Sequence, residues 1–329
     1  MPDLVNKRWG CRMSGKHSSF PFSADTDDLD QWFIANAPLL PTPALAFSHV
    51  PWDSTESVSA AAKGGPGSGG GGGGGGGSTG GVVTTYISGS PTVDDANEFN
   101  IKINFGGTWT AKQQAVVEWA ADFWSSIITG DVHNDLDLNG NLVDDIVITV
   151  STGRIDGNGN PLTGNTLAQT SNIVVRDPGT ADAWLPLTAS IKLDSTDLKS
   201  TSLSGTWDAI ILHEMGHALG FVGSIFSQLG LTDNAGHFTG AHAMAAYGGP
   251  VPLEDTGGSG TAGSHWDESN FAPNGQQMSN ELMTGYFVPG ETTLLSDATV
   301  GALADLGYTV GDPSVGSPSI MIDSHLLIV

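Results

Sequence analysis

The sequence predicts one mixed α+β domain over residues 82–311, with a twisted mixed sheet, a buried helix and a loop-rich C-terminal part. Three observations support this prediction. The first half contains segments in which polar and apolar residues alternate, the period of a half-buried strand. Other segments place apolar residues at helical spacing. Beyond Gly220, glycine and other loop-forming residues dominate.

Three segments are expected to form strands. Residues 100–105 (NIKINF) alternate polar and apolar side chains, and residues 145–150 (DIVITV) follow as a second strand. Residues 185–193 (LPLTASIKL) form the third. Because Pro186 has no backbone N–H, this strand is expected either to begin there or to lie at a sheet edge.

Three helices are expected. Thr110 opens the first, and Gln113 three residues later completes a capping-box pattern. Residues 209–219 form the second helix, which is closed by Gly220, a residue suited to left-handed backbone geometry. Residues 296–306 form a last short helix before another glycine.

Two terminal segments and a linker flank the domain. Residues 64–81 contain nine consecutive glycines, which lose too much backbone entropy on ordering and predict a flexible linker. Residues 1–63 are rich in Ser, Pro and Asp and are expected to form a partly disordered leader or propeptide-like segment. Residues 312–329 are expected to be a C-terminal tail.

The composition argues against several classes of protein. The net charge is −24 and the pI is about 4.3, so the surface repels nucleic-acid phosphates and anionic lipid headgroups. No cationic side chain follows Lys199, which favours metal ions or cationic substrates as partners, or reflects solubility alone. The sequence has no run of 18 apolar residues that would predict a membrane-spanning helix, so no membrane insertion is expected. With Cys11 as the single cysteine, no intrachain disulfide can form.

The strongest chemical signal is an H-E-x-x-H motif at residues 213–217. Four residues is just over one helical turn, so His213 and His217 leave the same face and can bind one Zn²⁺ at about 2.0–2.1 Å. Glu214 would act as general base on a metal-activated water. The alternative is a surface helix with two solvated histidines, but the apolar run before the motif predicts burial.

A third zinc ligand must come from farther along the chain. The longer pattern H-E-x-x-H-x-x-G-x-x-H matches through Gly220, but Gly223 stands where its third histidine is expected. The side chains downstream that could complete the site are His237, His242, His265, Glu254 and Glu268.

Four motifs in order resemble the leishmanolysin-like branch of the metzincin zinc peptidases. They are HEMGHALGF (213–221), FTGAHAMAAYGG (238–249), GSHWDES (263–269) and NELMTG (280–285).

This resemblance implies a metzincin-like fold with an insertion before the third ligand, which matches His265. It also implies that Met283 is the methionine of a tight turn beneath the zinc, a hydrophobic floor and not a ligand. The chain departs from the family at His242, where Asn is more frequent, and at Tyr286, which follows Met283 by three residues instead of two.

The resulting expectation is a zinc endopeptidase that cleaves internal peptide bonds. A polypeptide substrate would bind in extended form along an edge strand, for which 185–193 is the candidate. The protein is expected to act as a monomer on polypeptides, with no nucleic-acid partner. The alternatives are a non-catalytic zinc- or calcium-binding surface or adhesion protein, and a zinc amidase acting on small or cell-wall peptides.

Weaker signals add three expectations. Asp135, Asp137 and Asn139 fit the first half of a calcium loop, although Ile146 occupies the position of its bidentate carboxylate; an Asx-rich turn is the alternative. Cys11 could cap the zinc as a thiolate, or be inert. Residues 322–329 resemble the C-terminal export signal of some bacterial secreted metalloproteases, which predicts secretion without an N-terminal signal peptide; a final strand is the alternative.

Overall fold

The computed structural model describes the predicted domain with a few gaps. The described residues are 12–13, 82–90, 92–156, 166–198, 206–256, 260–270, 272–273, 278–287, 293–311 and 320–322. The expected leader and linker lie outside them except for residues 12–13, and the tail except for 320–322. Cys11 and the rest of the suggested export signal also lie outside the described residues.

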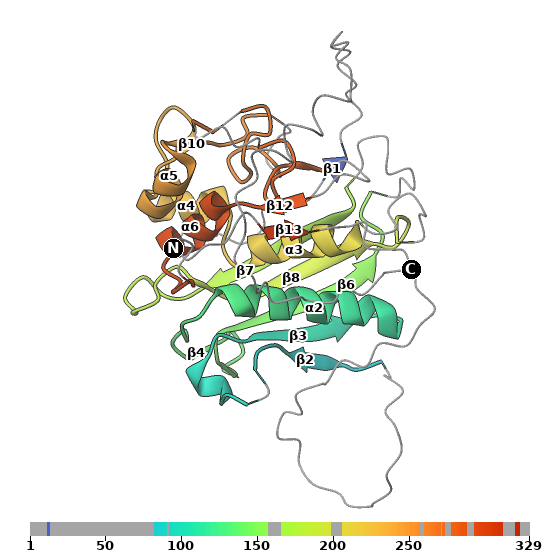
Figure 1. Cartoon of the computed structure of the whole chain (residues 1–329). Coiled ribbons are helices and arrows are strands. Elements are labelled where there is room, and N and C mark those ends of the chain that lie inside the picture. Colours follow the sequence, from blue (N-terminus) through green and yellow to red (C-terminus); the bar gives the residue numbers. More distant parts are fainter. Residues whose placement is uncertain are drawn as a thin grey trace, which may run out of the picture. The chain divides into compact units, whose positions relative to one another are not determined.

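The centre of the domain is a five-stranded mixed sheet in the order β2-β3-β6-β8-β7 (Figure 1). The strands are β2 (Thr85–Ile87), β3 (Ile101–Gly106), β6 (Ile146–Gly153), β8 (Pro186–Asp194) and β7 (Ala168–Val175). The three central strands run parallel, whereas β2 and β7 run antiparallel to their neighbours. All three predicted strands are present within a few residues of the expected bounds.

The prediction that residues 185–193 form a sheet edge is wrong. They form β8, which pairs with β6 on one side and β7 on the other. Pro186 is the first residue of β8, a position where a missing N–H is tolerated. The edge strand next to β8 is β7, which the sequence did not predict because irregular pairing between Ser171 and Val174, with Asn172 at φ 53°, interrupts its alternation.

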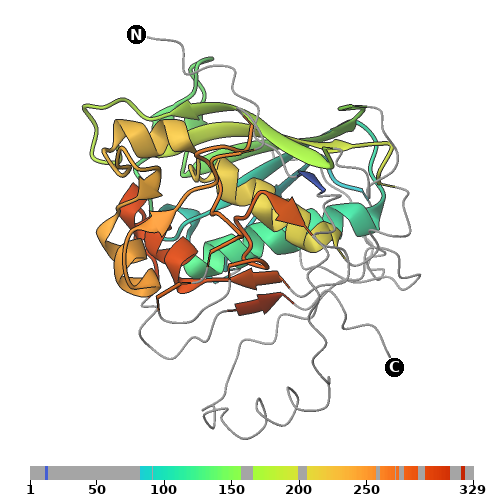
Figure 2. The same cartoon turned by 90° about the horizontal axis from the view of Figure 1, so that it is seen from above.

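Two helices cover the same face of the sheet (Figures 1 and 2). They are α2 (Ala111–Ile127) and α3 (Trp207–Ala218). The capping box of Thr110 and Gln113 is confirmed at the start of α2. Trp124 of α2 is fully buried, and its indole N–H donates to the carbonyl of Leu212 in α3 at 3.1 Å, which joins the two helices.

The helix α3 ends as predicted, since Gly220 follows it at φ +103°. The stretch Trp207–Gln228 is apolar and long enough to cross a membrane, but 89% of its most apolar part is buried inside the domain. Its apolar character is therefore accounted for by a position in the core.

The C-terminal part contains more regular structure than the sequence predicted. Its elements are α4 (Gly223–Gln228), β9 (His237–Phe238), α5 (Ala241–Tyr247), β10 (Val251–Pro252), β11 (Tyr286–Phe287), β12 (Thr293–Leu295) and α6 (Asp297–Leu306). The predicted last helix is confirmed as α6, capped by Ser296 and ended by Gly307 at φ +119°. The helices α4 and α5 are too short to give a clear apolar period.

Short pairings complete the domain. Remaining elements are β1 (Arg12–Met13), η1 (Asp95–Asn97), β4 (Asp135–Leu136), β5 (Leu142–Val143) and β13 (Ile320–Ile322). The pairs β9–β10, β12–β13 and β4–β5 are antiparallel, and β1 runs parallel to β11. The described part of the tail is thus a strand.

Candidate metal centre

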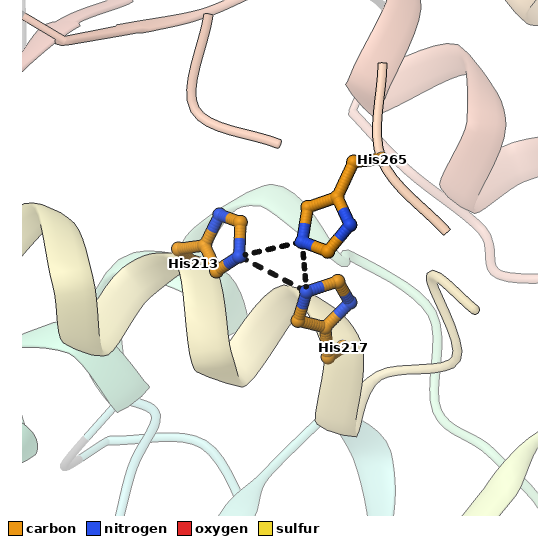
Figure 3. Close-up of side chains that lie close together, drawn as sticks. All are labelled: His213, His217 and His265. Atoms are coloured by element: carbon orange, nitrogen blue, oxygen red, sulfur yellow. Dashed lines mark hydrogen bonds between the residues drawn. The ribbon is translucent and has the colours of Figure 1, made fainter. Parts of the chain in front are cut away.

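Three imidazole rings meet in the interior of the domain (Figure 3). His213 and His217 project from α3 one turn apart, and His265 comes from a distant segment. The Nε2 atom of His217 lies 3.0 Å from that of His213 and 3.0 Å from that of His265, and the third pair is 3.2 Å apart. All three side chains are fully buried. The structure therefore brings together the histidine pair and the predicted third ligand.

Backbone hydrogen bonds to two neighbouring segments hold His265 in place. The backbone N–H of Glu254, just after β10, donates to the carbonyl of His265 at 2.9 Å. On the other side, the N–H of Trp266 donates to the carbonyl of Met283 at 2.9 Å. The segment that carries His265 thus lies between two others and faces α3.

The other candidate ligands lie elsewhere. His237 pairs with Asp233 at 2.9 Å, and His242 pairs with Asp305 at 2.8 Å. Glu254 and Glu268 group with Asp267 and not with the imidazoles.

Backbone carbonyls determine which nitrogen of each ring carries the proton. The Nδ1 atom of every ring lies within hydrogen-bond distance of a carbonyl oxygen, which can only accept, so Nδ1 must be the donor. The carbonyls belong to Leu282 for His213, Phe221 for His217 and Thr261 for His265, at 2.7, 2.7 and 2.8 Å. Each Nε2 is left with a lone pair directed at the other two.

This arrangement fits a bound cation. Three converging lone pairs cannot hydrogen-bond to one another and repel unless a positive ion lies between them. Tetrahedral ligands at about 2.0–2.1 Å from Zn²⁺ would be about 3.3 Å apart, close to the separations found here. Burial lowers the pKa of His213 to about 3, that of His265 to about 4, and that of His217 well below its usual value. The rings are therefore neutral at pH 7, the form that binds metals.

Glu214 is fully buried beside the first histidine, and it reaches the sheet. The hydroxyl of Thr170, on the edge strand β7, lies 2.7 Å from Oε2 of Glu214 and 2.8 Å from its main-chain oxygen. Sequence reasoning missed Thr170, because it belongs to no local motif and lies 44 residues from Glu214.

Met283 packs directly against α3. A Cβ atom added to Gly216, between the two histidines of the motif, would lie 2.6 Å from the sulfur of Met283. The glycine thus permits a close approach that any larger residue would block. Met283 is fully buried and lies in the turn that follows Leu282, whose carbonyl faces His213.

A buried carboxylate holds this turn in place. Glu281 accepts hydrogen bonds from the N–H of Met283 at 2.5 Å, from the N–H and hydroxyl of Ser296, and from the hydroxyl of Thr299. Burial raises its pKa despite these bonds. The sequence predicted no role for Glu281, although it lies in the NELMTG motif and in an otherwise uncharged stretch.

The expected calcium loop has the geometry of an Asx turn. The carboxylate of Asp137 accepts bonds from the N–H groups of Asn139 and Asn141 and from the side chain of Asn141, at 2.8–2.9 Å. These bonds lower the pKa of Asp137. Asp135, in β4, does not join it in an acidic cluster among the described residues. Calcium binding here stays a prediction without support.

Two imidazoles and a glutamate on one helix, with a third imidazole from a distant segment, define a candidate centre of the kind found in metal-dependent hydrolases. The family model of leishmanolysin matches residues 180–315, which include β8, the three histidines and Met283. The resemblance indicated by the motifs is thereby confirmed: this region is leishmanolysin-like, and the family implies metallopeptidase activity. No curated protein sequence matches the chain significantly.

Proposed function

We propose that this protein is a zinc-dependent endopeptidase of the metzincin type. The observation that carries the proposal is the convergence of three neutral imidazoles beside Glu214. An all-nitrogen ligand set favours zinc over calcium or magnesium, which prefer oxygen. The leishmanolysin family, which is zinc-dependent, supports the same choice.

The proposed roles follow from the chemistry of each side chain. His213, His217 and His265 would hold the ion. When bound, zinc would lower the pKa of water toward about 7 and polarise the scissile carbonyl. Glu214 would take a proton from the attacking water and return it to the leaving amine nitrogen. An intact glutamate at this position argues against a purely structural zinc site, which has no use for a base.

The substrate would lie along β7 and not along residues 185–193. The strand β7 pairs on one side with β8, and no described strand pairs with its other side. An extended peptide can add to such an edge through main-chain hydrogen bonds. Since Thr170 of β7 contacts Glu214, a peptide bound along this edge would pass close to the proposed base. Action as a monomer and export through the tail remain predictions from the sequence.

The substitution Glu214→Gln tests the mechanism. Glutamine keeps the size of the side chain but cannot accept the proton, so casein hydrolysis should fall by about 10²–10⁴-fold while zinc content stays at one ion per chain. Casein distinguishes an endopeptidase from an amidase that acts only on small peptides. Proteolysis that survives in this variant would contradict the assigned role of Glu214.

Metal analysis of His265→Ala tests the ligand set. Loss of a hydrogen-bond partner of a ligand typically lowers metal affinity about 10–100-fold, so loss of the ligand itself should weaken zinc binding by at least about a hundredfold and abolish hydrolysis. The matched control is His237→Ala, because His237 pairs with Asp233 and does not belong to the cluster of His213, His217 and His265. A wild-type protein that binds zinc but cleaves neither casein nor small peptides would instead support a non-catalytic binding protein.

A further inference from the structure

The contact between Thr170 and Glu214 joins two polar side chains that have no exposure to solvent. A buried hydroxyl or carboxyl group is costly unless it is hydrogen-bonded. The distance of 2.7 Å between Oγ1 and Oε2 is typical of a hydrogen bond, and the main-chain oxygen of Glu214, at 2.8 Å, is a second acceptor for the single hydroxyl proton.

Packing alone does not require a hydroxyl at position 170. Thr170 of β7 lies opposite Ile191 of β8, and both side chains are fully buried. Ala168, two residues earlier on the same face of β7, is apolar and buried as well. Valine has the shape of threonine and would fill this place, so what threonine adds is its hydrogen bond.

We propose that Thr170 is a positioning residue for the general base. Its hydroxyl holds Oε2 of Glu214, and this fixes the plane of the carboxylate and the direction of Oε1. The terminal torsion of a glutamate is broad, so a hydrogen bond to one carboxylate oxygen narrows the range of orientations of the group. This inference rests on the proposed function, because it needs Glu214 to be the base.

The strand that carries Thr170 gives the contact a second consequence. The strand β7 is also the edge on which we place the substrate, so one residue links the substrate-binding edge to the base. Orientation of a catalytic group contributes to the rate of the bound complex more than to substrate affinity. Loss of the hydroxyl should therefore lower kcat and leave KM nearly unchanged.

The test measures kcat and KM for a peptide substrate, together with zinc content and unfolding temperature. Thr170→Val and Thr170→Ala remove the hydroxyl, and Thr170→Ser keeps it. We expect kcat to fall about ten- to a hundredfold in the first two, with KM within about threefold, and to recover in the third. The matched control is Thr188→Val, on the neighbouring strand β8, which should keep wild-type kcat.

Each outcome decides the question. A kcat within about twofold of wild type in a zinc-loaded Thr170→Val protein would overturn the inference. So would an equal loss in Thr170→Ser, or loss of folding in both hydroxyl-free variants, since the hydroxyl would then serve the fold and not the base. If the wild type is inactive, or Glu214→Gln stays active, the proposed function itself has failed.

Discussion

At the scale of single residues, main-chain carbonyls orient the three histidine rings of the candidate centre. Each imidazole is held at Nδ1 by a main-chain carbonyl, that of Leu282, Phe221 or Thr261. Partners of this kind fix the ring and the tautomer and typically affect metal affinity strongly. Because the acceptors are main-chain atoms, the orientation of the ligands depends on the fold and survives most side-chain substitutions.

The buried histidines predict how the stability of the metal-free protein depends on pH. Their pKa values in the folded chain are about 3 for His213 and about 4 for His265, against an ordinary value of about 6.5 in the unfolded chain. Below pH 6.5 the unfolded chain takes up protons that the folded chain does not. The free energy of unfolding should therefore be largest above about pH 6.5. It should fall toward pH 4 by up to about 1.4 kcal/mol per pH unit for each ring.

Urea denaturation of chelator-treated protein between pH 7 and pH 4.5 checks this prediction. His265→Gln removes one titrating ring, so its free energy of unfolding should fall less steeply over the same range. Identical slopes for the two proteins would show that carboxylates alone cause the acid sensitivity.

The roles of single residues could be predicted from the sequence only where the residues belong to one short motif. His213, Glu214 and His217 share one motif, so their spacing along a helix indicated a metal site. His265 could be selected among several candidates only through the resemblance to a family. Thr170 and Glu281 act through contacts that depend on the tertiary fold, and no spacing in the sequence announces them.

At the scale of elements, the segment that leads into the turn at Met283 pairs with β12. The N–H of Leu282 donates to the carbonyl of Leu294 at 2.7 Å, and the N–H of Leu294 donates to the carbonyl of Asn280 at 2.8 Å. Leu294 lies in β12, which pairs in turn with β13. The carbonyl that orients His213 is therefore supported by strands well outside the metal centre.

Substitution of Gly216 tests the contact between this turn and α3. In Gly216→Ala the new methyl group would meet the sulfur of Met283, and overpacking of this kind should cost about 1–3 kcal/mol. Met283→Ala alone should also destabilise, through the cavity it leaves, but the double variant should be more stable than the sum of the two effects.

Urea denaturation of all four proteins measures the coupling. Gly179→Ala serves as the control, since no atom lies within 4 Å of the added methyl group. Strict additivity of Gly216→Ala and Met283→Ala would mean that the two residues do not share this space.

Elements with a clear period or cap were predicted well. The strands β3 and β6, the capped helix α2 and the glycine-ended helices α3 and α6 all follow from local patterns. The place of β8 in the sheet did not, since a proline at the first residue of a strand looks the same in a central strand as in an edge strand. The strand β7 was missed because its pairing is irregular, and the very short elements after α3 have too few residues for a period to show.

At the scale of the whole molecule, charge is the dominant feature. The chain has 35 acidic and 11 basic side chains, and like charges on one surface destabilise the compact state. Burial raises the pKa of Glu118 and of Asp145 to about 7, so the ionised form of these two carboxylates also destabilises the folded chain.

Salt should therefore stabilise the protein. Between about 20 mM and about 500 mM NaCl the screening length falls severalfold, and Tm should rise by a few degrees. Scanning calorimetry in NaCl, KCl and tetramethylammonium chloride checks this, because screening predicts similar rises in all three. An unchanged Tm would show that charge repulsion contributes little to stability, and a rise with one cation alone would point to specific ion binding.

The spacing of the proposed ligands has a consequence for the tolerance of the chain to changes in length. His265 follows His217 by 48 residues, so an ion held by both would close a ring that contains α4, β9, α5 and β10. The entropy of closing a ring grows only with the logarithm of its size, and doubling it costs about 0.6 kcal/mol. Relatives could therefore lengthen or shorten this stretch at little thermodynamic cost, provided that the residues flanking His265 keep their partners.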